Sequence, residues 1–340
     1  MLTVGVVGAG FMGQMHANVH SNLPNVKLVG VADIVPSKAA ELAGKFGARA
    51  YPSFEAMIEG ANPDLVDITL PTYLHCEYVL RAAKIGKHIL CEKPMARSLA
   101  EADRMVAAVK KARVKFMTAH CIRFWPEYVA LKQIVDSKKL GKLTSLYLSR
   151  MSPLPTWSWN GWLLDPRKSG SALLDLHIHD VDYVLHLLGK PKSVMSVAAR
   201  SKIGLSHVFT TYQYPGKAVV ALGGWDMPAK FPFKMAFRAN FEKGTVGCST
   251  GRTPTMLVYE VDKEPYEPEI KRPKAEGAVT GGNLSDLGGY YNEIKYFTDC
   301  IAAGKDPKTV TPMDARNSVA LVMAEEKSAL TGKPVKPALK

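Results

Sequence analysis

The sequence lacks three features that would assign it to particular classes of protein. Its 340 residues contain no run of 18 apolar residues, so we expect no membrane span and no membrane partner. Its five cysteines are scattered and form no CxxC pair, which predicts free thiols in a reducing cytoplasm. The start, MLTVGVVGAG, has neither a basic segment nor a small-residue cleavage site, so we expect no secretory signal. Together these absences favour a cytoplasmic protein.

A concentrated basic surface is also missing, although the net charge is +13. Lys and Arg are spread along the chain, and dense local cases are short, such as KKAR at 110–113. Because a nucleic-acid-binding protein concentrates its positive charge on one face, we expect no nucleic-acid partner. A basic surface still attracts anionic ligands, including a dinucleotide.

The sequence does contain two halves with different patterns. Hydrophobic residues make up 47% and charged residues 22%, which is typical of a globular chain long enough for two domains. In residues 1–122, predicted strands alternate with segments whose apolar residues recur at helical spacing. The strands are expected at 3–8, 26–33, 64–70, 87–92 and 115–120, and the helices at 11–22, 36–47, 73–86 and 98–113. This alternation predicts an α/β domain with a doubly wound parallel sheet covered on both faces.

Residues 123–340 show longer strand patterns with period-two alternation. Strands are expected at 142–152, 193–202, 207–214, 217–225, 233–242 and 255–261, and helices at 126–138, 289–303 and 313–331. This predicts a second α/β domain, for substrate binding and oligomerisation, whose open and mostly antiparallel sheet packs one face on helices. Since an open face needs covering, we expect a homodimer or homotetramer. Residues 262–285, rich in Pro, Glu, Lys and Gly, predict a long exposed loop.

A glycine-rich loop follows the first predicted strand and opens a helix. Gly8, Gly10 and Gly13 match GxGxxG, and they lie within a strand–helix–strand unit. Gly8 allows a tight turn, Gly10 lets the backbone approach a pyrophosphate, and Gly13 lets helix and strand pack closely. The N-terminus of the helix, at Phe11 and Met12, supplies N–H donors for that pyrophosphate. The loop therefore predicts a dinucleotide-binding site.

The residue that ends the second predicted strand indicates which dinucleotide binds. Asp33 is placed to accept hydrogen bonds from the adenosine ribose hydroxyls, and its carboxylate would repel a 2′-phosphate. The next residues, Ile34 and Val35, offer no Arg to hold such a phosphate. NAD is therefore favoured, and Lys38, the nearest cation, keeps NADP as a minority interpretation.

The predicted strand at 87–92 ends in CEKPMARS. Lys93 directly follows this strand, at the edge where ligands of parallel sheets bind, and Pro94 restricts the backbone beside it. A rigidly held Lys93 would donate to a substrate hydroxyl and ease removal of its proton. A simple surface charge is the alternative.

Residues 175–182 read DLHIHDVD. The apolar residues around them recur at spacings of three and four and predict one helix over 171–188, with N-cap chemistry in 169–171 and an end at Gly189: Leu174, Ile178, Val181, Leu185 and Leu188. Asp175, His179, Asp182 and His186 then share one stripe, and His177 and Asp180 point elsewhere. Because the two closely spaced histidines diverge, we expect no metal. A solvated stripe suits Asp182 and His186, or these may pair with neighbours, whereas Asp175 beside His179 favours an acid–base pair. His177 is interpreted as a packed or pocket-wall histidine.

Other polar residues are candidates for substrate contacts. His120 follows the predicted strand at 115–120, where a structural role is an equal alternative. In WSWNGWLLDP, at 157–166, Trp162 would stack on a sugar and Asp165 would hold its hydroxyls. A plain aromatic core cluster is the other interpretation of these tryptophans.

Four segments together resemble the Gfo/Idh/MocA family of sugar and polyol oxidoreductases, in the order and spacing of that family. They are GAGFMGQMHA, TLPTYLHCEYVLRAAKIGKHILCEKP, RFWPEY and SGSALLDLHIHDVD. The resemblance implies an N-terminal Rossmann domain followed by an α/β domain with an open sheet. It also implies a catalytic role for Lys93, with an often cis Lys93–Pro94 bond, and for Asp175 and His179, with His179 as the proton acceptor. Pro71, Thr72, His75, Glu92 and Arg123 match residues beside the cofactor or at the domain junction. His177 departs from the family, which usually has Gly there.

The expected function is reversible hydride transfer between a secondary alcohol of a cyclic sugar, polyol or glycoside and the nicotinamide of NAD(P). Two alternatives stay open. One is glycoside cleavage by transient oxidation without net turnover of NAD, and the other is a non-catalytic NAD-binding sensor. Retention of Lys93, Asp175 and His179 argues against the sensor.

Overall fold

The computed structural model describes residues 1–272 and 288–340, which form two compact units. The first unit comprises Met1–Phe124 and the described part of Pro273–Arg316, and the second comprises Trp125–Arg272 and Asn317–Lys340. The predicted binding domains, 1–122 and 123–340, stay a prediction, because compactness does not show which residues bind cofactor or substrate. The predicted loop at 262–285 lies partly outside the described residues, and its described part has only one bridge, between Val258 and Tyr266.

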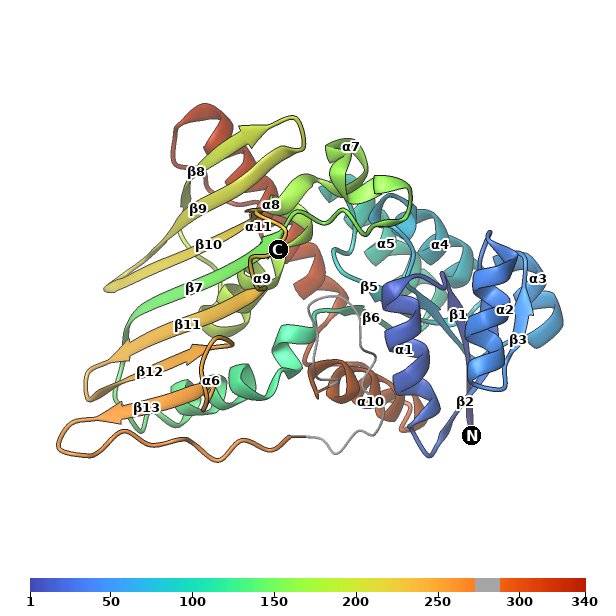
Figure 1. Ribbon diagram of the computed structural model, residues 1–340, viewed down its shortest axis with the longest axis horizontal. Coiled ribbons are helices and arrows are strands. Elements are labelled where there is room, and N and C mark those ends of the chain that lie inside the picture. The colour runs from blue at the N-terminus through green and yellow to red at the C-terminus, as the bar shows by residue number, and fades with distance from the viewer. Residues whose placement is uncertain (273–287) are drawn as a thin grey trace. The chain divides into compact units, whose positions relative to one another are not determined.

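The first unit contains a six-stranded parallel sheet with the order β3-β2-β1-β4-β5-β6 (Figure 1). Its strands are β1 (Leu2–Val7), β2 (Val26–Ala32), β3 (Arg49–Tyr51), β4 (Leu65–Ile68), β5 (His88–Glu92) and β6 (Phe116–Ala119). Because the order reverses between β1 and β4, right-handed crossovers place helices on both faces. The predicted doubly wound parallel sheet is therefore confirmed.

Helices alternate with these strands. They are α1 (Phe11–Ser21), α2 (Pro36–Lys45), α3 (Phe54–Ala61), α4 (Thr72–Lys84), α5 (Leu99–Ala112), the 3-10 turn η1 (Cys121–Phe124) and the later α10 (Gly288–Ala302). All residues of β4 and β6 are buried, as expected for strands covered on both sides. One apolar cluster joins β1, α1, β2 and α2 through Val6, Ala17, Val31 and Leu42.

The second unit contains a seven-stranded sheet with the order β13-β12-β11-β7-β10-β9-β8. Its strands are β7 (Leu143–Pro153), β8 (Val194–Ser201), β9 (Gly204–Tyr214), β10 (Lys217–Met227), β11 (Lys234–Phe241), β12 (Gly244–Ser249) and β13 (Met256–Glu260). The β7–β10 pair is parallel and the other pairs are antiparallel. The predicted mostly antiparallel sheet is confirmed.

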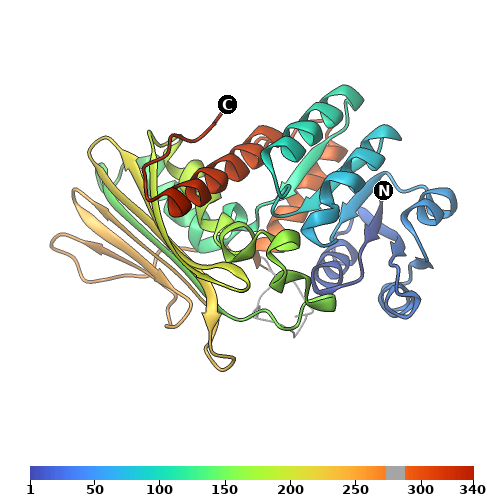
Figure 2. The same ribbon diagram turned by 90° about the horizontal axis from the view of Figure 1, so that it is seen from above.

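Helices of the second unit pack on one face of this sheet. They are α6 (Pro126–Ser137), the 3-10 turn η2 (Trp159–Leu164), α7 (Pro166–Ser169), α8 (Ser171–Asp175), α9 (Ile178–Leu188) and α11 (Pro312–Thr331), of which residues 317–331 belong here. Ser328 of α11 accepts the N–H of Ser196 in β8, and Asp180 of α9 pairs with Arg150 in β7. In Figure 2 the other face carries no helix from the described part of the chain.

The predicted single helix over 171–188 is wrong in one respect, because it breaks into α8 and α9. The N–H of His177 donates to the carbonyl of Ala172, five residues back, at 2.8 Å. This longer hydrogen bond replaces the regular helical pattern at Leu176 and His177 and starts a new helix at Ile178. Gly170, which lies in the predicted N-cap segment 169–171, is the N-cap of α8, and no side chain caps that helix.

Two simpler expectations can be compared with the described residues. None of the five cysteines forms a disulfide. Within residues 1–272 and 288–340, no helix combines the length and apolar character needed to cross a membrane.

Candidate cofactor and catalytic sites

The loop between β1 and α1 has the geometry that a bound pyrophosphate requires. Gly8 has a φ of +102°, and a Cβ there would lie 2.8 Å from the carbonyl oxygen of Thr69. A Cβ at Gly13 would lie 1.8 Å from the carbonyl oxygen of Gly8, so α1 approaches the loop closely only because this side chain is absent. A Cβ at Gly10 would meet no atom within 4 Å, so the space beside it is open. The residues thus fit the group that NAD would place there.

The N-terminus of α1 adds donors at this open space. The helix begins at Phe11, with Met12 next, and Gly10 is an N-cap without a capping side chain. The first N–H groups of a helix have no partner within the helix, and they carry the positive end of its dipole. This end of α1 would therefore favour an anionic phosphate.

Asp33 lies beside the glycine loop. It follows β2, its Oδ2 accepts the N–H of Ala9 at 2.7 Å, and its Oδ1 accepts the N–H of Val35 at 2.8 Å. These two bonds fix the carboxylate next to the loop. Each oxygen keeps a second lone pair, so ribose hydroxyls could still donate to it.

The segment that follows β4 is tied to the segment that follows β5 by a histidine. Pro71 is the N-cap of α4, Thr72 is buried, and His75 lies one turn further along. His75 places Nδ1 2.8 Å from the carbonyl oxygen of Pro94 and Nε2 2.8 Å from that of Leu70. Burial lowers the pKa of His75. Because both ring nitrogens face backbone carbonyls, any effect of His75 on the cofactor would act through these two loops.

Lys93 directly follows β5 at the carboxyl edge of the sheet. Its peptide bond to Pro94 is cis, in keeping with what the resemblance implies. Oε2 of Glu92 accepts the N–H of Lys93 at 3.0 Å. The side chain of Glu92 thus reaches its own neighbour's backbone, and its role beside the cofactor stays a prediction.

Sequence reasoning missed a buried ionic cluster that includes Glu92. His16 lies between the carboxylates of Asp67 and Glu92, and His20 contacts Asp67. Two signals were available: histidines four residues apart on a helix that covers a sheet, and an Asp inside the apolar strand LVDI. Neither signal shows which partner each side chain meets, because the partners are 51 and 76 residues away in sequence from His16.

Two further predicted residues of the first unit are buried. Arg123, in η1, donates from Nη1 to the carbonyl of Thr309 at 2.6 Å and lies 3.6 Å from the carboxylate of Asp314. His120 follows β6 and is 1% exposed. Arg123 thus joins η1 to the segment after α10, and the predicted cofactor and substrate roles of these residues stay predictions.

The predicted acid–base residues lie on either side of the helix break in the second unit. Asp175 is the last residue of α8 and is partly exposed, and His179 is the second residue of α9 and is 9% exposed. They therefore do not share one regular helical turn. The short turn of Leu176 and His177 determines where the two side chains lie relative to each other. Their catalytic roles stay predictions, as does that of Lys93 in the first unit.

The two aspartates of α9, Asp180 and Asp182, form structural contacts. Asp180 accepts from Nε and Nη2 of Arg150 at 2.9 and 3.1 Å, and Asp182 accepts from the hydroxyl of Ser318 at 2.7 Å. Both carboxylates are fully buried, so the solvated interpretation of Asp182 is wrong and the neighbour-pairing alternative holds.

His177 is a packed histidine, as one of the two interpretations proposed. It is fully buried, and its Nε2 lies 3.2 Å from Oε2 of Glu325 in α11. A Cβ at Gly223 in β10 would lie 2.9 Å from its Nδ1. His177 thus fills space between the helix break and the sheet.

The predicted sugar-binding residues near η2 have structural partners. Trp162 packs against a core cluster that contains Leu163 and Trp225, as the core interpretation expects. Asp165 caps α7 and accepts from the backbone and guanidinium of Arg167, which lowers the pKa of Asp165. Their roles in substrate binding stay predictions.

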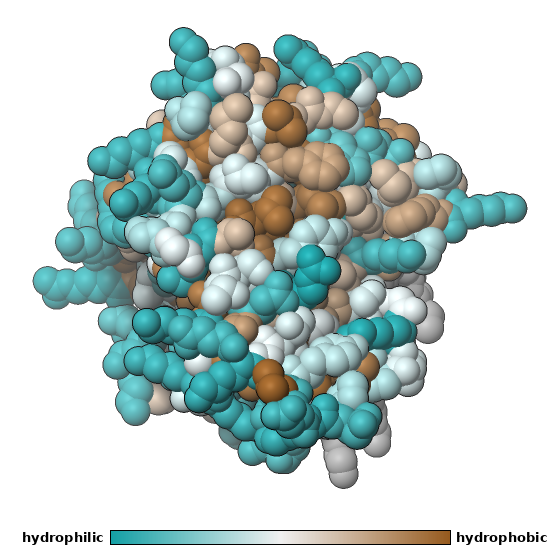
Figure 3. Space-filling view, turned by 90° about the vertical axis from the view of Figure 1, so that its left-hand side faces the viewer, coloured by the Kyte–Doolittle hydropathy of each residue, from teal (hydrophilic) through white to brown (hydrophobic). Residues whose placement is uncertain are grey.

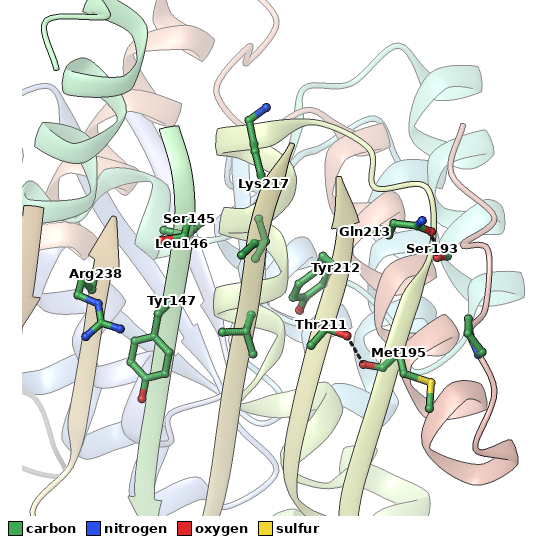
Figure 4. A pocket seen from close by; sticks show the side chains of 14 residues that line it. Ser145, Leu146, Tyr147, Ser193, Met195, Thr211, Tyr212, Gln213, Lys217 and Arg238 are labelled. Carbon is green, nitrogen blue, oxygen red and sulfur yellow. Dashed lines mark hydrogen bonds between the residues drawn. The ribbon is translucent and has the colours of Figure 1, made fainter. Parts of the chain in front are cut away.

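A hollow on the sheet of the second unit contains none of the predicted site residues. It crosses strands β8, β9, β10, β7 and β11, and Met195, Thr211, Tyr147 and Arg238 are among its lining residues (Figure 4). The described residues contain no group of three or more His, Cys, Asp or Glu side chains arranged to hold a metal ion.

Comparisons with known proteins agree with this geometry. A model of the GFO/IDH/MocA oxidoreductase family with an NAD-binding Rossmann fold matches residues 2–120, and a model of the GFO/IDH/MocA C-terminal domain matches residues 128–247. The chain is 33% identical over 191 residues to myo-inositol 2-dehydrogenase of Thermotoga maritima, which covers 56% of this chain and 55% of that protein. It is 29% identical over 282 residues to 2,7-anhydro-N-acetylneuraminate hydratase of Escherichia coli, covering 78% and 74%.

A solved structure extends the likeness to the whole chain. Levoglucosan dehydrogenase in complex with NADH and levoglucosan superimposes with a TM-score of 0.84 at 23% identity, covering 99% of both chains. At that identity the likeness concerns the fold, and the chain spans about half the length of the first curated relative. The two family models together match more than half of the sequence. The chain therefore belongs to the Gfo/Idh/MocA family of oxidoreductases with an NAD-binding Rossmann fold.

Proposed function

We propose that this chain catalyses the reversible, NAD-dependent oxidation of a secondary alcohol on a cyclic sugar or polyol. The observation that carries the proposal is the carboxyl edge of the first sheet. There the open space at Gly10, the oriented carboxylate of Asp33 and the position of Lys93 follow β1, β2 and β5 of one parallel sheet. Curated relatives named for myo-inositol and levoglucosan, 33% and 32% identical to this chain, support a cyclic polyol or sugar as the substrate class.

Three residues would carry the proton chemistry. His179 would take the proton of the substrate hydroxyl, and the Lys93 ammonium group would donate a hydrogen bond to the same oxygen while negative charge develops on it. Asp175 would orient the substrate or the base. NAD, when bound, accepts the hydride that leaves the carbon, so the alcohol becomes a ketone.

A substrate panel with two variants tests this proposal. The panel contains inositols, aldoses, anhydrosugars and glycosides, and the absorbance of NADH reports turnover. Lys93→Ala and His179→Ala should each lower kcat by roughly two orders of magnitude, because each removes a proton-transfer group, with NADH binding little changed. Near-normal turnover in both variants would exclude the assignment.

A second candidate is a reaction in which NAD is reduced and reoxidised within one cycle. The relative from Escherichia coli is named as a hydratase of an anhydro sugar, not as a dehydrogenase, and it matches more of this chain than the inositol enzyme does. Product analysis distinguishes the two candidates. Conversion of a glycoside or anhydrosugar without accumulation of NADH would favour this second reaction.

A second copy of this chain is the proposed partner of the open sheet face. Val197 and Phe209 are 59% and 47% exposed on neighbouring strands β8 and β9, where they are paired in register. Figure 3 shows apolar side chains gathered in the middle of the side of the molecule where this sheet lies. A twofold arrangement would bury the same apolar rows on both copies, which a homodimer or homotetramer requires.

A further inference from the structure

Four ionisable side chains meet inside the first unit. His16 and His20 come from α1, Asp67 from β4 and Glu92 from the end of β5. His16 places Nδ1 2.9 Å from Oδ2 of Asp67 and Nε2 3.0 Å from Oε1 of Glu92, while Nε2 of His20 lies 2.7 Å from Oδ2 of Asp67. The two histidines and Asp67 are fully inaccessible to solvent, and Glu92 is 4% exposed. These side chains therefore form hydrogen bonds with one another rather than with water.

Hydrogen-bond counting shows that the cluster holds an extra proton. Both ring nitrogens of His16 face carboxylate oxygens at hydrogen-bond distance, and each such contact needs a proton between nitrogen and oxygen. A neutral imidazole has one N–H, so two contacts with two ionised carboxylates require a doubly protonated ring. The alternative is a neutral ring that accepts from a protonated carboxyl group on one side. A shared metal ion does not account for these contacts, because the nitrogens lie at hydrogen-bond distance from the oxygens. In addition, the described residues contain no group of three or more His, Cys, Asp or Glu side chains arranged to hold a metal ion.

The surrounding charges favour the protonated ring. Burial alone would lower the pKa of His16, but Asp67 and Glu92 outweigh burial and raise that pKa well above its ordinary value. Two titratable neighbours stay neutral, because burial raises the pKa of Cys91, beside Glu92 in β5, and that of Tyr290 in α10. His20 on the same helix and the buried Glu293 in α10 are further ionisable groups near the cluster. His75 and Lys93 lie on the other side of Glu92.

The cluster connects directly to the backbone of Lys93. Glu92 uses Oε1 toward His16 and Oε2 to accept the N–H of Lys93 at 3.0 Å. On the other side of Lys93, the carbonyl of Pro94 lies 2.8 Å from Nδ1 of His75. Two buried histidines from α1 and α4 therefore hold the backbone immediately before and after Lys93.

We propose that His16 is a positioning residue for Lys93, acting as a doubly protonated ring that holds Glu92 so that Glu92 holds the Lys93 backbone. The proposal rests on the proposed function, in which Lys93 hydrogen-bonds the reacting oxygen. It assigns His16 no contact with substrate or cofactor. Loss of the Glu92 contact would leave Lys93 free to shift, and a shift of about 1 Å in a reacting group is enough to lower a rate strongly.

The protonation of His16 can be tested without any substrate. The whole chain, labelled with ¹⁵N in its nine histidines, gives ring-nitrogen NMR signals, and His16→Gln identifies those of His16. The expected result is two protonated ring nitrogens on His16 at pH 7.5, where a histidine with an ordinary pKa is neutral. A His16 ring with one bare nitrogen at pH 7.5 would overturn the proposal.

The positioning role can be tested with two substitutions of His16, each of which keeps only one of its two contacts. The amide nitrogen of Asn occupies the place of Nδ1, so His16→Asn keeps the contact with Asp67 and loses that with Glu92. The amide nitrogen of Gln occupies the place of Nε2, so His16→Gln keeps the contact with Glu92. At saturating NAD and substrate, we expect kcat to fall about tenfold or more in His16→Asn and to recover to within about threefold of wild type in His16→Gln.

His20→Asn is the matched control, because His20 is equally buried on the same helix and contacts Asp67 but not Glu92. It should change kcat by less than about threefold. Equal losses of kcat in all three variants, with lowered melting temperatures, would indicate a general structural role and overturn the proposal.

Lys93→Ala separates failure of this proposal from failure of the proposed function. If Lys93→Ala loses turnover and His16→Asn keeps it, the positioning role is wrong and the function stands. If Lys93→Ala itself retains normal turnover, the proposed function is wrong and the positioning role falls with it.

Discussion

At the scale of single residues, the glycines of the β1–α1 loop serve two different purposes. Gly13 faces the carbonyl oxygen of Gly8, and a Cβ would overlap that backbone atom, whereas Gly10 borders open space. The absence of a side chain at Gly13 is needed for folding, and its absence at Gly10 leaves space for a ligand. Substitution by alanine therefore separates the two effects.

We expect Gly13→Ala to lower the free energy of unfolding by about 3 kcal/mol or more, since backbone must move to relieve the overlap. Gly10→Ala should leave that free energy within about 1 kcal/mol of wild type and weaken NADH binding about tenfold, because the methyl group occupies ligand space. Urea unfolding and NADH fluorescence titration measure these quantities. Unchanged NADH affinity in Gly10→Ala would contradict the assigned pyrophosphate site.

Asp67 makes the stability of the first unit depend on pH in the acid range. Burial alone would raise its pKa, but His16 and His20 outweigh burial and lower the pKa of Asp67 from 3.8 to about 2. A carboxyl whose folded pKa is lowered stabilises the fold above its unfolded pKa, and this contribution disappears as the pH falls toward the folded pKa. The relevant window is therefore about pH 4 to pH 2.

Urea unfolding of wild type and Asp67→Asn at pH 5 and pH 3 tests this linkage. The stability advantage of wild type over Asp67→Asn should shrink by about 1 kcal/mol between these two pH values, because part of the shift is lost by pH 3. An advantage that stays constant from pH 5 to pH 3 would show that the Asp67 carboxyl is not stabilised in its ionised form.

At the scale of elements, the sequence predicts most strands and helices because their apolar patterns are strong. β3 was missed because only three residues pair, and two of them, Arg49 and Ala50, are exposed. β12 was missed because Gly244 and Gly247 interrupt its alternation. In both cases tertiary pairing, not local pattern, makes the strand.

The candidate site shows the same division between local and distant information. The glycine loop, Asp33 and Lys93 are recognisable because each depends on its place next to a strand. The partners of His16, the burial of Asp182 against Ser318 and the packing of His177 against Glu325 depend on contacts between distant segments. No periodicity in one sequence contains that information.

The break between α8 and α9 gives a prediction about packing. Because His177 lies against Gly223, Gly223→Ala should lower the free energy of unfolding by about 1 to 3 kcal/mol. In a His177→Gly background the same substitution should cost at least about 1 kcal/mol less, since the crowding side chain is gone. A double-mutant cycle by urea unfolding measures this coupling, and additive effects would show that the two positions do not share the space.

At the scale of the whole molecule, the open sheet face predicts self-association. The wild-type chain should have a solution mass of two or four times 37.1 kDa, and Phe209→Lys should shift it toward 37.1 kDa at equal concentration. Leu330→Lys is the matched control, because Leu330 is also exposed but lies on α11. Light scattering after size-exclusion chromatography measures the masses. A monomeric wild type would refute the proposed partner.

The placement of β7 in the centre of its sheet has a consequence for how the chain folds. Strands β8, β9 and β10 pair in succession, as do β11, β12 and β13, so each set of three can form from neighbouring sequence. β7 separates the two sets, and its residue Tyr147 pairs with Val220 on one side and Arg238 on the other. During synthesis β7 emerges first, yet one of its edges stays open until β10 has been made and the other until β11 has been made. Assembly of this sheet therefore depends on long-range pairing, which is slow and leaves the unpaired edges of β7 exposed to other chains in the meantime.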